Sequence, residues 1–571
     1  MGLITGLPLA RSPRFTVLNA SVNVVVALLA LDFLVRGFIV GPGEKTAFSR
    51  VGYLSPTTAH LLVREPDVAR LPLTVSYHEE EQQLDVDTWI KVDHAFDASD
   101  ETDFTVPVTL TDLKPSTWYR YSLSNNMTGS FTTAPLPGSE ASKSLSFVTS
   151  SCMKPNFPYD PFSHPLRIWG IEQLARTIAK LPPSFLRPSF MLFLGDFIYI
   201  DVPERFGSST AHYRSEYRRI YSSPSWSEPA DSPAINLPWL HMLDDHEIEN
   251  DWSQGNVTPP FPAAIDPYVH YQVSVNPPIP DVPFAKPEET TYFSFIHGPA
   301  SFFMLDTRSY RSEPAHPNST ILGPAQLQSL LAYLARPEPA DVRWKIISSS
   351  VPFTKNWRVG TMDTWGGFLY ERETVFQALW LAERELGIRV VLLSGDRHEF
   401  GATRFPDPSL NLPADEFQPY TPGVGVHEFS VGPLSMFYLL VHTYRQTDNQ
   451  DVAVKYAPDG NSKFGLIDIT TKDVEVDQVF IPSSVLTYSL YVEGSLVWQY
   501  GLSVPLSASD QPSSFSPGRV LFDEVCKTEG LYSYVKTFVS RSEEVVSFLW
   551  QKASQLFFQS LGKMRSFERV D

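Results

Sequence analysis

An aspartate and a histidine stand two residues apart at Asp396 and His398, directly behind the apolar run at residues 388–393. The run is typical of a buried strand, so both side chains are expected at its C-terminal end. A carboxylate and an imidazole in that position suit metal binding or acid–base chemistry. The alternative is a strand end closed by a salt bridge, with Arg397 as the cation.

Two similar arrangements lie upstream. Asp196 and Tyr199 follow the apolar residues 190–194, and the sequence Asp-Asp-His-Glu at residues 244–247 follows the apolar residues 237–243. Parallel strands deliver their C-terminal ends to one edge of a sheet, so three such strand ends predict a single site. A carboxylate can bridge two cations, and a phenolate is a hard ligand suited to Fe(III). A helix-capping aspartate, a core tyrosine and a solvated charge cluster are the alternatives.

The composition narrows the class of protein. The 571 residues are 43% hydrophobic and 19% charged, which predicts two or more packed domains rather than a disordered chain. The net charge of −19 argues against binding the phosphate backbone of nucleic acid, so no nucleic-acid-binding surface is expected. Cys152 and Cys526 lack the spacing of a disulfide framework. Cys152 ends a strand pattern, where a thiolate could join a metal, although a free buried cysteine is the common alternative.

Residues 1–45 have the pattern of a targeting segment. Arg11 and Arg14 precede an apolar stretch at residues 22–40, which three polar residues interrupt. The interruptions make it a poor full-length span, and no clear cleavage site follows, so a signal anchor or an uncleaved signal peptide is expected. A core helix packed on the body is the alternative. The pattern predicts a protein that is membrane-anchored, in the secretory pathway or extracellular.

Glycosylation motifs agree with that location. The motif Asn-x-Ser/Thr occurs four times, and the three copies beyond the N-terminal segment are the glycosylation candidates, Asn126, Asn256 and Asn318. Each motif is weak by chance frequency, but together they fit a lumenal or extracellular body.

Residues 46–134 have the pattern of a small β-sandwich. Short alternating runs are bounded by turn residues at short intervals. The segment that contains Leu113, Pro115, Tyr119 and Tyr121 resembles the tyrosine corner of fibronectin type III domains. Nothing in this region carries catalytic chemistry, so a packing or positioning role is expected.

Residues 144–505 alternate helix and strand patterns. Helical periodicity is present at residues 167–181, 324–334 and 371–386. Strand patterns are found at residues 190–194, 292–296, 300–305, 344–348, 390–393 and 426–431. This alternation predicts an α/β architecture with a partly parallel sheet. In the tail, residues 520–571, an apolar stripe predicts a C-terminal helix that docks on the body or lies in a membrane interface.

The order of these motifs resembles one family. The series of strand–Cys152, strand–Gly-Asp-x-x-Tyr, strand–Asp-Asp-His-Glu and strand–Gly-Asp-Arg-His is similar to that of the alkaline phosphatase D (PhoD-like) family of calcineurin-like metallophosphoesterases. The resemblance covers residues 144–435 and extends to residues 46–134, because that family carries an N-terminal fibronectin-like domain. It implies an α/β (α+β) metallophosphoesterase sandwich.

The resemblance also implies a set of metal ligands. An iron-type site would include Cys152, Asp196 and Tyr199, and neighbouring cations, which the family implies to be calcium, would be held by Asp196, Asp245, Asp396 and His398. Zinc or manganese are the alternative metals. The wider superfamily usually has asparagine in place of Asp245, and the added negative charge favours a hard cation over zinc. Ser151-Cys152-Met153 replaces the usual Asp-x-His motif, which argues against a standard di-zinc site.

The implied activity is hydrolysis of phosphate monoesters, diesters or both, through hydroxide generated on a metal. His246 would protonate the leaving oxygen or stabilise charge, and Arg397 would hold either a phosphate oxygen or a ligand carboxylate. Three further residues are candidates for support or substrate contact, with core positions as the alternative: Asp244, Trp365 and His427. The competing hypotheses are a catalytically silent, membrane-tethered scaffold and a serine esterase, which the absence of a Gly-x-Ser-x-Gly motif disfavours.

Overall fold

The computed structural model describes residues 13–41, 43–79, 89–227, 237–278, 290–409, 425–438, 441–476, 479–506 and 520–524. Residues 37–524 form one compact unit, and the described residues 13–36 lie outside it. The predicted C-terminal helix lies outside the described residues from position 525 onward. The first five residues of that predicted tail are a strand, β21 (Val520–Glu524), which corrects its boundary. Their sequence, Val-Leu-Phe-Asp-Glu, begins with three residues that favour strands or tolerate them well.

The N-terminal helix α2 spans Pro13–Val40. Its segment Thr16–Gly37 is long and apolar enough to cross a membrane, a criterion that a signal sequence also meets, and among the described residues it is the one helix that meets it. The polar residues in this segment oppose membrane insertion less than the sequence indicated. Asp32 and Arg36, one turn apart, form an ion pair with 3.4 Å between nitrogen and oxygen. A paired charge is less costly in an apolar environment than an isolated one.

The predicted β-domain is a sandwich of two antiparallel sheets. One has the order β1-β2-β5 and the other the order β4-β3-β6-β7. The strands are β1 (Phe48–Leu54), β2 (Ala59–Arg64), β3 (Val75–Glu79), β4 (Ile90–Lys91), β5 (Thr105–Leu110), β6 (Trp118–Leu123) and β7 (Thr128–Thr132). The Tyr119 hydroxyl accepts a hydrogen bond from the backbone N–H of Lys114 at 2.9 Å, the bond that defines a tyrosine corner.

The larger region contains two seven-stranded mixed sheets. The first has the order β10-β9-β8-β18-β19-β20-β21, in which β8, β9 and β10 are mutually parallel. Its strands are β8 (Leu145–Ser150), β9 (Met191–Phe193), β10 (Trp239–His241), β18 (Lys463–Val476), β19 (Val479–Val492), β20 (Ser495–Pro505) and β21. The second has the order β11-β12-β13-β14-β16-β15-β17, with β12, β13, β14 and β16 parallel. Its strands are β11 (Phe293–His297), β12 (Ala300–Met304), β13 (Trp344–Ser349), β14 (Arg389–Ser394), β15 (Phe400–Phe405), β16 (Val426–Ser430) and β17 (Val452–Ala457).

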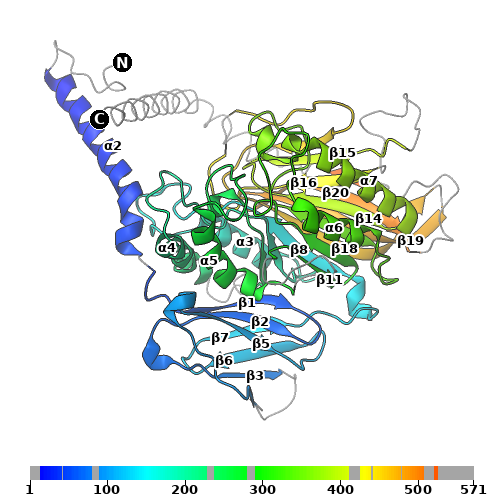
Figure 1. Ribbon diagram of the computed structural model, residues 1–571, viewed down its shortest axis with the longest axis horizontal. Coiled ribbons are helices and arrows are strands. Elements are labelled where there is room, and N and C mark those ends of the chain that lie inside the picture. Colours follow the sequence, from blue (N-terminus) through cyan, green and yellow to red (C-terminus); the bar gives the residue numbers. More distant parts are fainter. Residues whose placement is uncertain are drawn as a thin grey trace. The chain divides into compact units, whose positions relative to one another are not determined.

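The two sheets pack face to face between layers of helices (Figure 1). The shared core joins residues from both, as in the edge-to-face contact of Phe147 on β8 with Phe302 on β12, whose ring centroids are 5.4 Å apart. Helices α3 (Trp169–Lys180), α4 (Thr210–Tyr221) and α5 (Phe261–Tyr271) pack on the first sheet, whereas α6 (Gly323–Ala335) and α7 (Leu369–Leu386) pack on the second. The long antiparallel strands β18, β19 and β20 were not among the strands that the sequence predicted.

The three glycosylation candidates, Asn126, Asn256 and Asn318, are all exposed. Exposure makes them accessible to a transferase, and glycosylation itself stays a prediction.

Candidate metal centre

The predicted ligands come together from the C-terminal ends of four strands. Cys152, Asp196 and Asp245 follow β8, β9 and β10, which are parallel neighbours in the first sheet. Asp396 and His398 follow β14, which belongs to the second sheet. The sequence predicted one sheet edge, and the structure corrects this point, because the site forms where the edges of two sheets meet.

Each Gly-Asp pair lets two strand ends approach closely. A Cβ atom on Gly195, whose φ is +103°, would lie 2.5 Å from the Cβ of Asp244. A Cβ on Gly395 would lie 2.7 Å from the Cβ of Ser151. Real Cβ atoms do not come this near to other carbons, so any larger residue would push the neighbouring loop away. The glycines therefore set the spacing at which the carboxylates gather.

Four of the gathered residues have left-handed backbone conformations. The φ angles are 62° at Cys152, 59° at Asp196, 72° at Asp396 and 50° at His398. This region is uncommon for residues other than glycine and is strained unless the surroundings enforce it. Such conformations cluster at functional sites, so the backbone supports the assignment made from side-chain chemistry.

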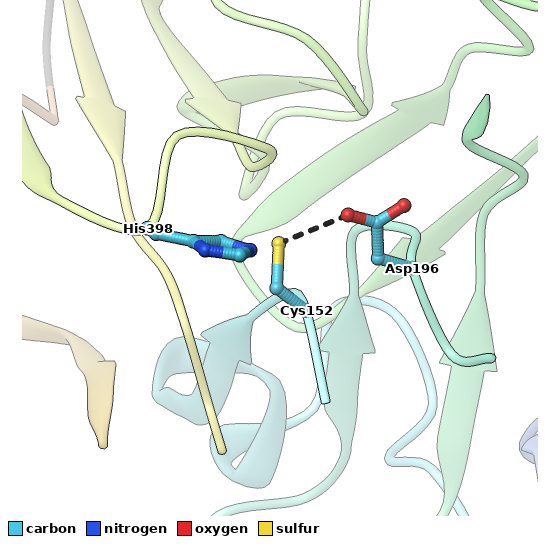
Figure 2. A group of neighbouring side chains, drawn as sticks. All are labelled: Cys152, Asp196 and His398. Atoms are coloured by element: carbon cyan, nitrogen blue, oxygen red, sulfur yellow. Dashed lines mark hydrogen bonds between the residues drawn. The ribbon is translucent and has the colours of Figure 1, made fainter. Parts of the chain in front are cut away.

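A thiol, a phenol and an imidazole form one side of the centre. Figure 2 shows Cys152, Asp196 and His398 converging, with the Cys152 thiol donating a hydrogen bond to Asp196 Oδ2 at 3.3 Å. The Tyr199 hydroxyl donates to the same oxygen at 2.9 Å and lies 2.8 Å from His398 Nε2. Burial, reinforced by Asp196, raises the pKa of Cys152 and of Tyr199 well above their usual values. The protein alone therefore keeps both groups protonated.

Carboxylates form the other side. Ligand atoms of Asp196, Asp244 and Asp396 lie within 4.8 Å of one another, and so do those of Asp196, Asp245 and His246. Burial raises the pKa of Asp396 to about 7, that of Asp244 to about 6 and that of Asp196 well above its usual range. Burial acts in the same direction on Asp245, but Arg308 and His246 bring its pKa below the usual value.

Two of these carboxylate oxygens test whether the site fits a metal. Asp196 Oδ1 and Asp244 Oδ2 are buried and have no hydrogen-bond partner in the part of the chain that the structure describes. An uncompensated buried carboxylate is costly, so such oxygens need a cation. The donor set fits that role, because hard oxygen donors lie on one side and a thiol, phenol and imidazole on the other. Asp196 belongs to both sides, because its carboxylate contacts Cys152 and Tyr199 and is also grouped with Asp244, Asp245 and Asp396.

His246 is held in place by a residue that the sequence analysis missed. The Oδ1 atom of Asp201 lies 2.6 Å from Nδ1 of His246, and Asp201 also accepts a backbone hydrogen bond from Asn250 at 2.7 Å. The imidazole ring lies over Tyr199 with 4.2 Å between centroids. Burial lowers the pKa of His246, but the carboxylates of Asp245, Asp196 and Asp201 outweigh it and raise that pKa well above 6.5. In the sequence, Asp201 could have been noticed as a further carboxylate five residues after Asp196, in the same loop.

A buried arginine, also missed, ties the carboxylate side to the second sheet. Arg308 donates from Nε to Asp244 Oδ1 at 2.5 Å and from its two terminal nitrogens to Asp363 at 2.6 and 2.8 Å. Arg311 donates to the same Asp363 at 2.7 Å. Arg308 stands four residues after the end of β12, in the sequence Asp-Thr-Arg, which was the available signal. Its charge offsets part of the repulsion between the carboxylates.

Glu247, the last residue of the Asp-Asp-His-Glu motif, which the sequence analysis left without a role, holds two of the ligand loops together. Its carboxylate accepts backbone hydrogen bonds from Asp196 at 3.1 Å, from Asp244 at 2.9 Å and from Phe197. Burial raises its pKa to about 8, although these N–H groups act against the rise. Glu247 therefore positions both loops, and its oxygens are occupied by backbone N–H groups instead of being offered to a metal.

Three predicted candidates have other contacts. Arg397 forms an ion pair with Asp396 at 2.9 Å, and its remaining nitrogens donate to the carbonyls of Val359 and Gly360 at 3.1 and 2.7 Å. This geometry matches the alternative in which Arg397 supports a ligand. Trp365 is fully buried, stacks on Phe353 with centroids 4.4 Å apart and therefore lies in the core.

His427 is likewise a core residue. It lies within β16, where its ring contacts Arg389 at 3.2 Å and the Tyr500 hydroxyl at 3.2 Å. The register pairs it with Val391, three residues before the end of β14, so it does not reach the metal centre. For Trp365 and His427 these contacts match the core positions that were the alternative in the sequence analysis.

Comparison with known proteins defines the class. A family model described as PhoD-like phosphatase matches residues 147–480, more than half of the chain. A solved structure titled "Structure of PhoD" has a TM-score of 0.57 and 17% sequence identity, over 86% of this chain and 93% of that chain, which shows a shared fold. Comparison with curated proteins gives no match.

The chain therefore belongs to the PhoD-like phosphatase family, as the series of motifs predicted.

Proposed function

We propose that this protein is a metal-dependent phosphoesterase that hydrolyses phosphate monoesters, diesters or both. Membership of the PhoD-like phosphatase family supports the reaction class. The observation that carries the proposal is the cluster around Asp196. Its residues offer ligand atoms within 4.8 Å of one another, and buried oxygens of Asp196 and Asp244 have no hydrogen-bond partner among the described residues. A silent scaffold on the same fold would have no need to retain such a costly arrangement.

The proposed metals follow the chemistry of the two sides. Cys152, Asp196 and Tyr199 would hold Fe(III), and His398, which the sequence analysis assigned to the calcium ions, lies on their side and would join them. Asp196, Asp245 and Asp396 would hold one or two Ca²⁺ ions, with zinc or manganese as the alternatives. Bound cations would neutralise the phosphate oxygens and lower the pKa of a water molecule that attacks phosphorus. Asp244 would support this side through its hydrogen bond to Arg308.

The chain's own residues supply the remaining chemistry. His246, oriented by Asp201, would donate a proton to the leaving oxygen as the bond to phosphorus breaks. Arg397 would hold Asp396 in its strained conformation through the ion pair and its two backbone hydrogen bonds. Arg308 would keep Asp244 ionised beside its neighbouring carboxylates.

We also propose how the remaining parts serve this activity. The N-terminal segment would act as a signal or membrane anchor, which places the enzyme in the secretory pathway or outside the cell. The β-sandwich would be fibronectin type III-like, and the tyrosine corner supports this. Asn126, Asn256 and Asn318 would carry glycans.

The test is activity and metal content measured on the same sample. The metal-loaded protein should hydrolyse members of a panel of phosphate mono- and diesters, and Asp196→Asn should lose bound metal and most activity while it still folds. Asp468→Asn is the matched control, because Asp468 lies on β18 opposite Ser146, at the far end of β8 from Cys152. Full activity of Asp196→Asn, or an inactive parent that retains its metal, would refute the proposal.

Elemental analysis tests the metals separately. We expect iron and calcium in gently purified protein. Two zinc ions without iron or calcium would contradict the assignment of metals and leave the phosphoesterase proposal standing.

A further inference from the structure

One side of the metal centre is apolar. Cys152 and Tyr199 pack with the buried side chain of Met436 in a small hydrophobic cluster, and the partly buried Phe157 and Val202 pack against it. Met436 is brought there because the segment after β16 runs beside the segment after β8, where Ser435 N–H donates to the carbonyl of Cys152 at 3.2 Å. Hydrocarbon therefore reaches the metal ligands directly on this side.

A partly exposed aromatic ring extends this surface. Phe437 is 41% exposed, and its ring meets the ring of His398 edge to face, with centroids 5.1 Å apart and an interplanar angle of 84°. It also lies 6.3 Å from the ring of Phe157. We call Phe157, Val202, Met436 and Phe437 the apolar wall. Its outer members leave hydrocarbon in contact with solvent beside the ligands, which is a feature of binding sites.

Another side of the centre is charged. Asp245, Asp251 and Asp363 have ligand atoms within 4.8 Å of one another, and Arg308 reaches Asp245 at 3.5 Å and Asp363 at 2.6 Å. These residues carry net negative charge, so an anionic end of a substrate would bind here only through cations held by the carboxylates, whereas an apolar end would bind at the wall. The ionic end is the phosphoryl group, since that is the group on which the metal centre acts.

The position of His246 decides which part of the ester is apolar. Its ring lies over Tyr199, a member of the cluster that carries the apolar wall. His246 also offers a ligand atom within 4.8 Å of those of Asp196 and Asp245, so it lies between the charged residues and the wall, and an alcohol whose oxygen it protonates could extend over Tyr199 toward the wall. In hydrolysis a P–O bond forms from water, the P–O bond to the alcohol breaks, and the proton passes to the alcohol oxygen.

We propose that the enzyme prefers phosphate esters of apolar alcohols, and that the apolar wall binds the alkyl or aryl group of the leaving alcohol. This inference rests on the proposed function. Each methylene group that the wall removes from water should tighten binding by about 2- to 4-fold until the wall is covered.

Binding and hydrolysis are tested in parallel on the metal-loaded full chain. Methyl-, butyl- and octylphosphonate, which cannot be hydrolysed, serve as binding probes in calorimetry, and methyl, butyl and octyl phosphate esters serve as substrates. We expect affinity and kcat/KM to rise with chain length. Phe437→Ser should flatten both trends and Phe437→Leu should restore them. Phe185→Ser, which alters a 47% exposed ring before the start of β9, should leave the trends intact.

The outcomes separate the two proposals. Hydrolysis of all three esters at equal kcat/KM, or a uniform loss in Phe437→Ser at every chain length, would overturn the apolar preference and leave the phosphoesterase intact. Chain-length-dependent phosphonate binding without hydrolysis of any ester would support the wall and overturn the proposed function. Equal flattening in Phe185→Ser would show a general surface effect and overturn the inference.

Discussion

Two buried groups of charged side chains in this molecule differ in how their polar atoms are satisfied. In the core of the second sheet, Glu428 accepts hydrogen bonds from the backbone of Phe353 and Thr354 at 2.7 and 3.0 Å, and both oxygens of Asp451 contact Arg372 at 2.8 Å. At the metal centre, buried oxygens of Asp196 and Asp244 have no hydrogen-bond partner among the described residues.

The difference distinguishes carboxylates that protein donors hold from carboxylates that have capacity left for a ligand. A buried carboxylate whose oxygens are all occupied by protein donors contributes to folding and has no capacity left for a ligand. A buried carboxylate with a free oxygen destabilises the protein until something else binds it. The two groups can therefore be told apart by what happens when a cation or a side chain is removed.

Metal removal should give the largest effect. Chelation should lower kcat/KM by about 10³-fold or more, because bound cations would activate the attacking water and offset the negative charge of the phosphoryl group. It should also lower the free energy of unfolding, by about 4 kcal/mol if the metal was present at a thousand times its Kd. Activity and melting temperature before chelation, after it and after readdition of metal check this. An Asp196→Asn protein that responded equally would contradict the assignment.

Removing a carboxylate from the hydrogen-bonded group in the core should lower the stability of the fold and leave metal binding unchanged. Asp451→Ala leaves the buried charge of Arg372 without its partner, and the expected loss is about 3–5 kcal/mol of unfolding free energy. Urea unfolding measures it, and metal content per folded molecule should not change. Asp448→Ala is the control, since that side chain is 38% exposed and its pair with Lys355 should contribute less than about 1 kcal/mol. Equal losses in the two variants would remove the distinction.

Asp201 is a carboxylate beside the metal centre whose two oxygens both contact protein groups, so its replacement tests a positioning role. Asp201→Ala frees the Nδ1 side of His246, and kcat should fall roughly 10- to 100-fold with bound metal unchanged. Steady-state kinetics and metal analysis on the same sample check this. Glu204→Ala, at an exposed neighbouring position, should have no effect. Loss of metal from Asp201→Ala would show that Asp201 holds the ion and not the histidine.

His241 tests whether a buried polar atom outside the metal centre, without a hydrogen-bond partner among the described residues, only lowers the stability of the fold. Its Nδ1 has no hydrogen-bond partner among the described residues, and burial lowers its pKa to about 3. The unfolded chain takes up the proton first as pH falls below 6.5, so the folded state loses stability from there down to about pH 3.

His241→Phe, in a site bordered by Phe193 and Phe197, should abolish that loss, worth about 2 kcal/mol at pH 5. Unfolding in urea at pH 7 and pH 5 measures the difference. An unchanged pH dependence would mean that other groups dominate the acid lability.

The family, the alternation of elements and the strand ends could be predicted from the sequence. Apolar runs that stop at Asp196, Asp245 and Asp396 identify buried strands whose ends carry donors, and this signal is local in the chain. The strands β18 to β20 were overlooked because β18 is buried on both faces over its first half, which removes the alternation that marks a half-exposed strand.

The contacts that complete the site could not be predicted in the same way. Arg308 and Asp363 are separated by many residues. They meet because β12 and β13 are neighbours in the second sheet, so that the segments that follow these two strands lie together. Trp365 stands beside such residues in sequence, yet its side chain enters the core, since its indole N–H bonds to Ser349 at 3.0 Å. Side-chain direction and long-range pairing are properties of the folded chain, so they became visible only in three dimensions.

The spread of the ligands along the chain has a consequence for how the enzyme matures. Cys152 stands near the start of the catalytic region and His398 well inside its second half, on different sheets. A growing polypeptide therefore has no complete binding site until residue 398 has left the ribosome and both sheets have closed on one another. Loading with metal must come late in biogenesis, after the assembly of the sandwich and not as its nucleus.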